Sequence, residues 1–191
     1  MMRMNSITNL ADIRYAGFGV RLKAFTLDYL PIAVYIILLF GLTMLVTWVM
    51  NAIGRPLSWP ENPLFGDLIA FLILVLPVIL YFTLQESSPN QATWGKRKIG
   101  LLVMTGGGER LTFGRAFIRS FLKFLPWQIA HTCLFHWQGW PFAPEEPSLM
   151  VLVGFGLVYL LVGLYIASAL ITKDHRTPYD WAAGAYVIER L

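Results

Sequence analysis

The chain has 191 residues, of which 57% are hydrophobic and only 14% are charged, whereas soluble domains are about 25% charged. Its mean hydropathy is +0.59, so too little polar surface is present to cover the apolar side chains in water. These values argue against a soluble enzyme, a disordered protein and a free-standing nucleic-acid binder. They predict an all-α integral membrane protein whose main partner is the lipid bilayer, and a length suited to one domain, residues 1–191.

Three apolar segments predict membrane-spanning helices. A spanning helix needs roughly 20 apolar residues, and the segments at about 24–50, 67–85 and 149–171 meet that requirement. The first of them exceeds it, so we expect that helix to tilt or bend. Residues 1–20 lack the apolar core and cleavage site of a secretory signal, which predicts that the N-terminus is retained.

A fourth apolar segment is interrupted by polar side chains. Arg115, Arg119 and Lys123 recur every four residues, so they share one face of a helix. As a single element, the segment predicts a spanning helix over about 117–140 with these cations at its inner end. As two elements, the basic part would lie on the membrane surface and Pro126 would bend the chain.

The distribution of charge favours four spans with both termini in the cytoplasm. In that arrangement Arg55 is the one cation among the 15 Lys and Arg residues that falls outside, as the positive-inside rule requires. Three spans would move Lys173, Arg176 and Arg190 to the outer side. The net charge of +4 is therefore a signal of topology, and no nucleic-acid partner is expected.

A small cytoplasmic β-hairpin is predicted between the second and third spans. Residues 99–105 form a β-like run, Gly106 to Gly108 supply a turn, and residues 110–113 would return as the second strand. The expected fold is thus a four-helix transmembrane bundle with a cytoplasmic hairpin.

Asp28, near the start of the first span, is the most informative polar residue. A carboxylate at the edge of the hydrocarbon costs up to about 3 kcal/mol, so it requires a partner or a function. Pro31 has no N–H, which frees the carbonyl of Leu27, and a carboxylate beside a free carbonyl is suited to bind a cation or a proton. Alternatively, Asp28 lies at the water interface, or pairs with Arg21 or Arg119 and holds helices together.

Other polar residues extend the candidate site. Asp180 follows the last span on the same side as Arg21 and Asp28, so these three are predicted to form a charged cluster, which Glu86 could join. Gln128 and His131 share a face of the predicted third span. They suit either a proton relay or hydrogen bonding between helices.

The order of these residues resembles the RDD family of bacterial membrane proteins, named for one arginine and two aspartates. By position those residues are Arg21, Asp28 and Asp180. Further motifs are Glu86, Thr93-Trp94-Gly95-Lys96, Gly100, Arg115 and Arg119, and the resemblance extends from Gly17 to Ile188. It implies membrane transport of small ligands, with cation/proton exchange for some members.

The favoured function is a transporter of a small solute or cation, coupled to protons. Asp28 would be the binding or protonation site, with Arg21 and Asp180 controlling its charge. The alternative is a non-transporting membrane subunit or scaffold. We expect no enzyme activity, no cofactor and no metal centre, because the three histidines are dispersed. A homo-oligomer in the bacterial inner membrane is expected, since four helices leave little room for a path through one subunit.

Overall fold

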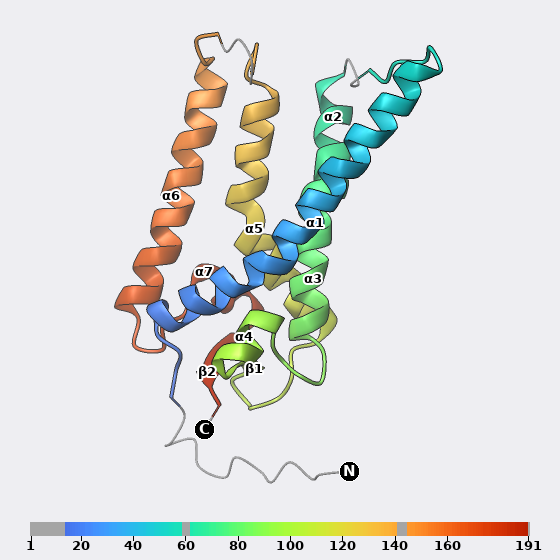
Figure 1. Ribbon diagram of the computed structural model, residues 1–191. Helices are drawn as coiled ribbons and strands as arrows, with labels where there is room; N and C mark the ends of the chain where they lie inside the picture. Colours follow the sequence, from blue (N-terminus) through green and yellow to red (C-terminus); the bar gives the residue numbers. More distant parts are fainter. Residues whose placement is uncertain (1–13, 59–61, 141–144, 191) are drawn as a thin grey trace.

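The computed structural model describes residues 14–58, 62–140 and 145–190. The chain is mostly helical, and a two-stranded sheet lies at one end (Figure 1). The long upright elements are α1 (Phe18–Ala52), α5 (Phe113–Phe135), α6 (Leu149–Ile171) and a continuous stack of α2 (Pro63–Ala70), a π-helical turn (Phe71–Val75) and α3 (Leu76–Glu86). The short elements α4 (Trp94–Ile99), β1 (Leu101–Thr105), α7 (Pro178–Ala183) and β2 (Ala185–Glu189) gather at the end that we call the charged end.

Within the described residues, three helices are long and apolar enough to cross a membrane: Phe18–Ala52, Leu64–Glu86 and Leu149–Ile171. They coincide with three of the predicted spans. Many of their large side chains face outward, and Ile37, Leu38 and Trp48 of α1 are 68–69% exposed. An apolar surface of this extent requires lipid around it, so the chain is a membrane protein.

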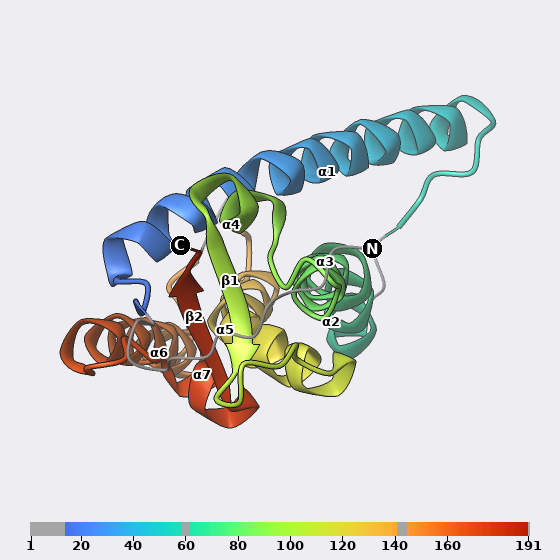
Figure 2. The same ribbon diagram turned by 90° about the horizontal axis from the view of Figure 1, so that it is seen from below.

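Helix α5 combines the two interpretations of the fourth apolar segment. It is one helix from Phe113 to Phe135, shorter than the predicted span to residue 140, and Pro126 lies inside it. Its N-terminal half runs across the charged end, whereas its C-terminal half stands beside α6 (Figure 2). A proline inside a helix removes one backbone hydrogen bond and bends the helix, so Pro126 explains the change of direction.

The predicted hairpin is wrong in its second strand. β1 pairs antiparallel with β2 near the C-terminus, with Leu101 opposite Glu189 and Thr105 opposite Ala185. Residues 110–113 contribute one isolated bridge, from Arg110 to Met104. The reason is that Thr112 caps α5, its Oγ1 accepting from the backbone N–H of Arg115, and a helix start at this point prevents a returning strand.

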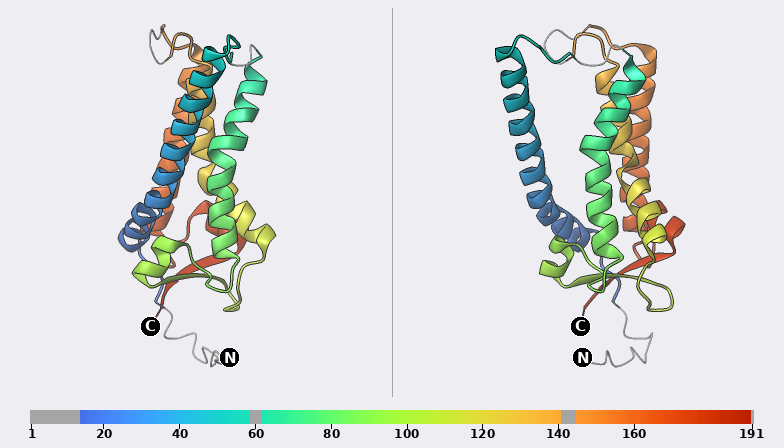
Figure 3. Two further views of the ribbon diagram at one scale, coloured as in Figure 1. Left: turned by 45° about the vertical axis from the view of Figure 1, so that its right-hand side comes forward. Right: turned by 90° about the vertical axis from the view of Figure 1, so that its right-hand side faces the viewer.

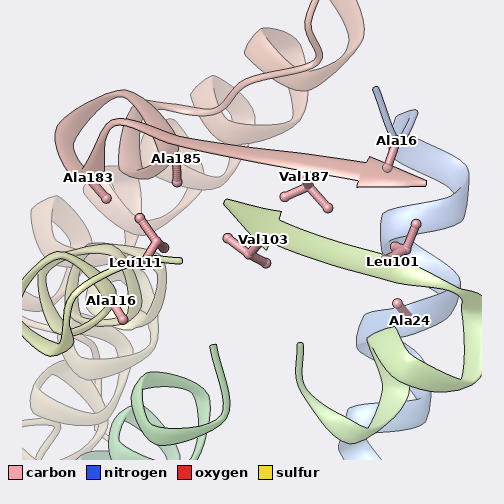
Figure 4. Packing of buried hydrophobic residues seen from close by; sticks show 9 residues of the cluster. All are labelled: Ala16, Ala24, Leu101, Val103, Leu111, Ala116, Ala183, Ala185 and Val187. Atoms are coloured by element: carbon pink, nitrogen blue, oxygen red, sulfur yellow. The ribbon is translucent and has the colours of Figure 1, made fainter. Parts of the chain in front are cut away.

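The distant strand β2 brings its own apolar face to β1. Ala185 and Val187 alternate along β2 and meet Val103 of β1 in a buried cluster that also includes Ala16 and Ala116 (Figure 4). The burial of small side chains from segments far apart in the sequence joins the two ends of the described chain at the charged end. Because no short turn connects β1 to β2, turn residues in the sequence could not indicate that these strands pair.

A second buried cluster links α1, α3 and α5 nearer the middle of the molecule. Phe82 of α3 packs against Phe124 of α5 with ring centroids 5.0 Å apart, and Phe25 of α1 lies beside both. Tyr35 of α1 still donates to the carbonyl oxygen of Ile73, and beyond this contact α1 stands apart from the other helices (Figure 3). The tightly packed part of the protein is therefore next to the charged end.

Candidate functional site

Four of the predicted site residues meet in a buried ion-pair network. Asp180 Oδ2 accepts from Arg21 Nη1 at 2.7 Å, and Asp180 Oδ1 accepts from Arg119 Nε at 2.8 Å. Arg119 Nη1 lies 2.5 Å from Glu86 Oε2. Arg119 thus bridges two carboxylates that belong to segments 94 residues apart.

Lys96 is the fifth member of the network, and sequence reasoning did not assign it to the site. Its Nζ lies 2.5 Å from Glu86 Oε1, and its side chain is buried. Lys96 is part of the quoted motif Thr93-Trp94-Gly95-Lys96, so the signal was present in the sequence. What the sequence did not provide was the position of α4, which carries Lys96 inward.

The network ties five helices together at the charged end. Its members lie on α1, at the end of α3, on α4, on α5 and in the first turn of α7: Arg21, Glu86, Lys96, Arg119 and Asp180. Asp180 also accepts a hydrogen bond from the backbone N–H of Thr177 at 3.2 Å, which caps α7. Because Glu86 and Asp180 are fully buried, each depends on its cations for stability.

Two titratable side chains of α7, Asp180 and Tyr179, each keep a single protonation state at neutral pH. Burial alone would raise the pKa of Asp180, but the attraction of Arg119 and then of Arg21 outweighs burial and holds the pKa below its usual range. Burial, followed by the charge of Asp180, raises the pKa of Tyr179 to about 12. Asp180 is therefore ionised and Tyr179 protonated at neutral pH, and neither suits proton exchange there.

Asp28 is separate from this network. Its fully buried carboxylate accepts three hydrogen bonds, from Thr93 Oγ1 at 2.5 Å, from the backbone N–H of Gly95 at 2.7 Å and from Tyr81 Oη at 3.0 Å. Among the residues that the structure describes, no cation lies within ion-pair distance of Asp28, so the predicted pairing with Arg21 or Arg119 is not made. Asp28 instead anchors the start of α4 against α1.

Gln128 and His131 do not reach the network. Gln128 Nε2 donates to Thr132 Oγ1 at 3.3 Å, and His131 Nδ1 lies 3.0 Å from the carbonyl oxygen of Trp127. Both contacts are within one turn of α5. The structure therefore brings together Arg21, Glu86, Arg119 and Asp180 of the predicted site and leaves these two residues outside it.

A cavity of about 350 Å³ borders the network between α1, α5, α6 and α7. Most of its lining is apolar and aromatic, including Phe25, Trp127 and Tyr165. The charged residues of the lining are one carboxylate and four cations: Asp28, Arg21, Lys96, Arg119 and Lys123. Glu86 and Asp180 pair with three of these cations from outside the lining, so four cations and three carboxylates lie at this end of the apolar space.

The described ranges contain no group of three His, Cys, Asp or Glu side chains that could hold a metal ion. The chemistry of the site is that of paired charges beside an apolar cavity. Such an arrangement is suited to bind, to orient or to exclude a charged ligand.

Comparison with known proteins gives a family for the chain. The sequence profile of the RDD family matches residues 15–184, a range that includes Arg21, Asp28 and Asp180. The chain is also 31% identical over 117 residues to the uncharacterised protein YxaI of Bacillus subtilis (strain 168), a match that covers 58% of this chain and 76% of YxaI. No solved structure matches the chain. The extent of the profile match, together with the residues it covers, shows that the chain belongs to the RDD family.

Proposed function

We propose that this membrane protein is a transporter of a small solute, coupled to protons, and not an enzyme. The observation that carries the proposal is the cavity of about 350 Å³ beside the charged network, which is within the usual size range of ligand sites, about 300–1,000 Å³. Asp28 is the carboxylate of the lining, and in this proposal it exchanges the proton. Arg21 and Asp180 then set the electrostatic field in which it does so.

The charge of the lining favours an anionic solute. Glu86 and Asp180 pair with three of the four cations that border the cavity, and among the described residues no carboxylate pairs with the fourth, Lys123. A free cation would therefore meet the uncompensated charge of Lys123 in the low-dielectric interior. An anion would be attracted, and its entry together with a proton would reduce the charge that must cross. Of the two solute classes that the sequence predicts, the small solute is therefore favoured over the cation.

The proposal also includes an orientation of the protein in the membrane and its association into a homo-oligomer. Arg55 follows the C-terminal end of α1, where its backbone N–H donates to the carbonyl oxygen of Met50, and this end of α1 lies opposite the charged end (Figure 1). The positive-inside rule therefore supports a cytoplasmic charged end in a bacterial inner membrane. A homo-oligomer would supply neighbours for the part of α1 that stands apart from the other helices. The mass of the protein reconstituted in nanodiscs tests the assembly.

Asp28→Asn is expected to abolish transport. The protein is reconstituted in phosphatidylcholine liposomes that contain a trapped pH dye, and a pH gradient is imposed with inorganic phosphate, hexyl phosphate, Na⁺, Li⁺ or K⁺ added in turn. We expect proton movement that depends on an anion in the wild type. In Asp28→Asn it should fall to the level of empty liposomes, because an amide cannot exchange the proton.

The matched control for this experiment is Asp67→Asn. Asp67 is a carboxylate of α2 at the opposite end, where His136 Nδ1 lies 3.6 Å from its Oδ2, and its loss should leave flux unchanged. All variants are compared at the same amount of folded protein. If folded wild-type protein moves protons with none of the five solutes, the transporter proposal is wrong.

A second candidate function is a non-transporting scaffold. It is favoured because both carboxylates of the network are already paired with cations. Each of the carboxylates Glu86 and Asp180 contacts two cations, an arrangement that stabilises contacts between helices. A scaffold would show no flux for any solute, and neutralising its charges would reduce assembly of the protein. The flux experiment therefore separates the two functions.

A further inference from the structure

Lys123 differs from the other cations of the cavity in having no carboxylate partner. Its Nζ lies 3.8 Å from the ring centroid of Phe82, 4.3 Å from that of Phe25 and 5.2 Å from that of Phe124. In the part of the chain that the structure describes, no carboxylate oxygen lies within ion-pair distance of it. Ring faces stabilise an ammonium group, but they leave its three donors without acceptors. Desolvation of Lys123 disfavours the charged form, and a bound anion would restore it.

Arg21 contributes a second unused donor to the same cavity. Its Nη1 binds Asp180 and its Nε donates to the carbonyl oxygen of Ala16 at 2.8 Å. Its Nη2 is buried and has no hydrogen-bond partner among the described residues. A buried donor without an acceptor is costly, so the cavity contains two cationic groups that an anion would satisfy.

The rest of the cavity faces the lipid. Leu22 and Tyr29 of α1, Trp127 of α5 and Ile166 of α6 line it, and all four are exposed. Helices α1 and α6 lie close together at the charged end and far apart at the other end (Figure 1). A ligand could therefore enter from the side, with its apolar part still in contact with the membrane.

We propose that the cavity binds an anionic phospholipid from the surrounding membrane, with the phosphate at Lys123 and Arg21 and an acyl chain along the exposed side chains of α1, α5 and α6. The inference rests on the proposed function in that it takes this cavity as the ligand site. It does not require transport. Phosphate is an acceptor with several oxygens, so one headgroup can receive both unused donors.

Native mass spectrometry of the detergent-solubilised protein tests the binding. The protein is mixed with palmitoyl-oleoyl phosphatidylglycerol or with the phosphatidylcholine of the same chains, and retained lipid is counted. We expect one phosphatidylglycerol to be retained and phosphatidylcholine to be lost. Lys123→Gln should weaken retention about tenfold, as expected for the loss of a charge-assisted hydrogen bond, and Lys123→Arg should keep it.

Arg115→Gln is the matched control. Arg115 lies on the same helix two turns before Lys123 but is exposed, so its loss should leave retention unchanged. Lys123→Gln should fold, because it removes a partly buried charge that no carboxylate of the described residues pairs. Its thermal unfolding is measured without lipid to verify this. Equal retention of the two lipids, or unchanged retention in folded Lys123→Gln, would overturn the inference.

Hexyl phosphate distinguishes the lipid from a free anion. Quenching or enhancement of Trp127 fluorescence, obtained as the difference between wild type and Trp127→Phe, reports occupancy of the cavity that Trp127 lines. If hexyl phosphate changes this signal and phosphatidylglycerol is not retained, the membrane source is wrong while the proposed anion transporter remains supported. If the lipid binds and no solute drives proton movement, the inference holds and the transporter proposal fails.

Discussion

Arg119→Ala is expected to destabilise the folded protein by about 3–5 kcal/mol, the usual cost of breaking a buried ion pair by removing one partner. Arg119 is the one residue of the described network that contacts both Glu86 and Asp180. Its removal leaves two fully buried carboxylates with one cation each, Lys96 for Glu86 and Arg21 for Asp180. The measurement is equilibrium unfolding in mixed micelles of dodecyl maltoside and increasing dodecyl sulfate.

Arg115→Ala provides the control for this prediction. It lies one helical turn before Arg119 on the same basic stripe but is exposed, so its removal should change stability by no more than about 0.5 kcal/mol. Arg119→Lys should fall between the two, because an ammonium group keeps the charge but lacks the planar fork that reaches both carboxylates. Equal stability of Arg119→Ala and Arg115→Ala would show that the network does not form.

The stripe of Arg115, Arg119 and Lys123 shows how far the sequence predicts the site. Their spacing correctly placed the three cations on one face of a helix. It did not separate them by environment: Arg115 is exposed, Arg119 binds two carboxylates, and Lys123 lies among aromatic rings. This difference arises because the N-terminal half of α5 crosses the charged end, so each successive turn meets a different neighbour.

The membrane-spanning helices could be predicted because their sequence signal, a run of apolar residues, is local. The strand pairing of the sheet could not be predicted. Some 20 apolar residues in a row identify a helix in lipid whatever surrounds it. Pairing of β1 with β2 joins residues 101–105 to 185–189. Neither segment contains a sequence pattern that identifies the other as its partner. The same limit applied to Asp28, whose acceptor role toward Thr93 and Gly95 depends on where α4 docks.

That docking leads to the second large effect, which we expect from Gly95→Ala. Alanine normally favours a helix by about 1 kcal/mol relative to glycine. At Gly95, however, an added Cβ would overlap the carbonyl oxygen of Ala24 and lie 2.9 Å from both Cγ and the backbone nitrogen of Asp28. Since two of these three neighbours are backbone atoms of α1, α4 must move away and Asp28 loses donors. We expect destabilisation of about 3 kcal/mol, the upper end of ordinary overpacking.

The sequence contains a close counterpart for comparison. Thr112-Phe113-Gly114-Arg115 starts α5 as Thr93-Trp94-Gly95-Lys96 starts α4: threonine caps the helix, an aromatic residue follows, and glycine precedes a cation. Nothing lies within 4 Å of a Cβ at Gly114, so Gly114→Ala should be neutral or slightly stabilising. Thermal unfolding in detergent compares the two variants. If Gly95→Ala unfolds at or above the wild-type temperature, α4 does not rest on α1 as described.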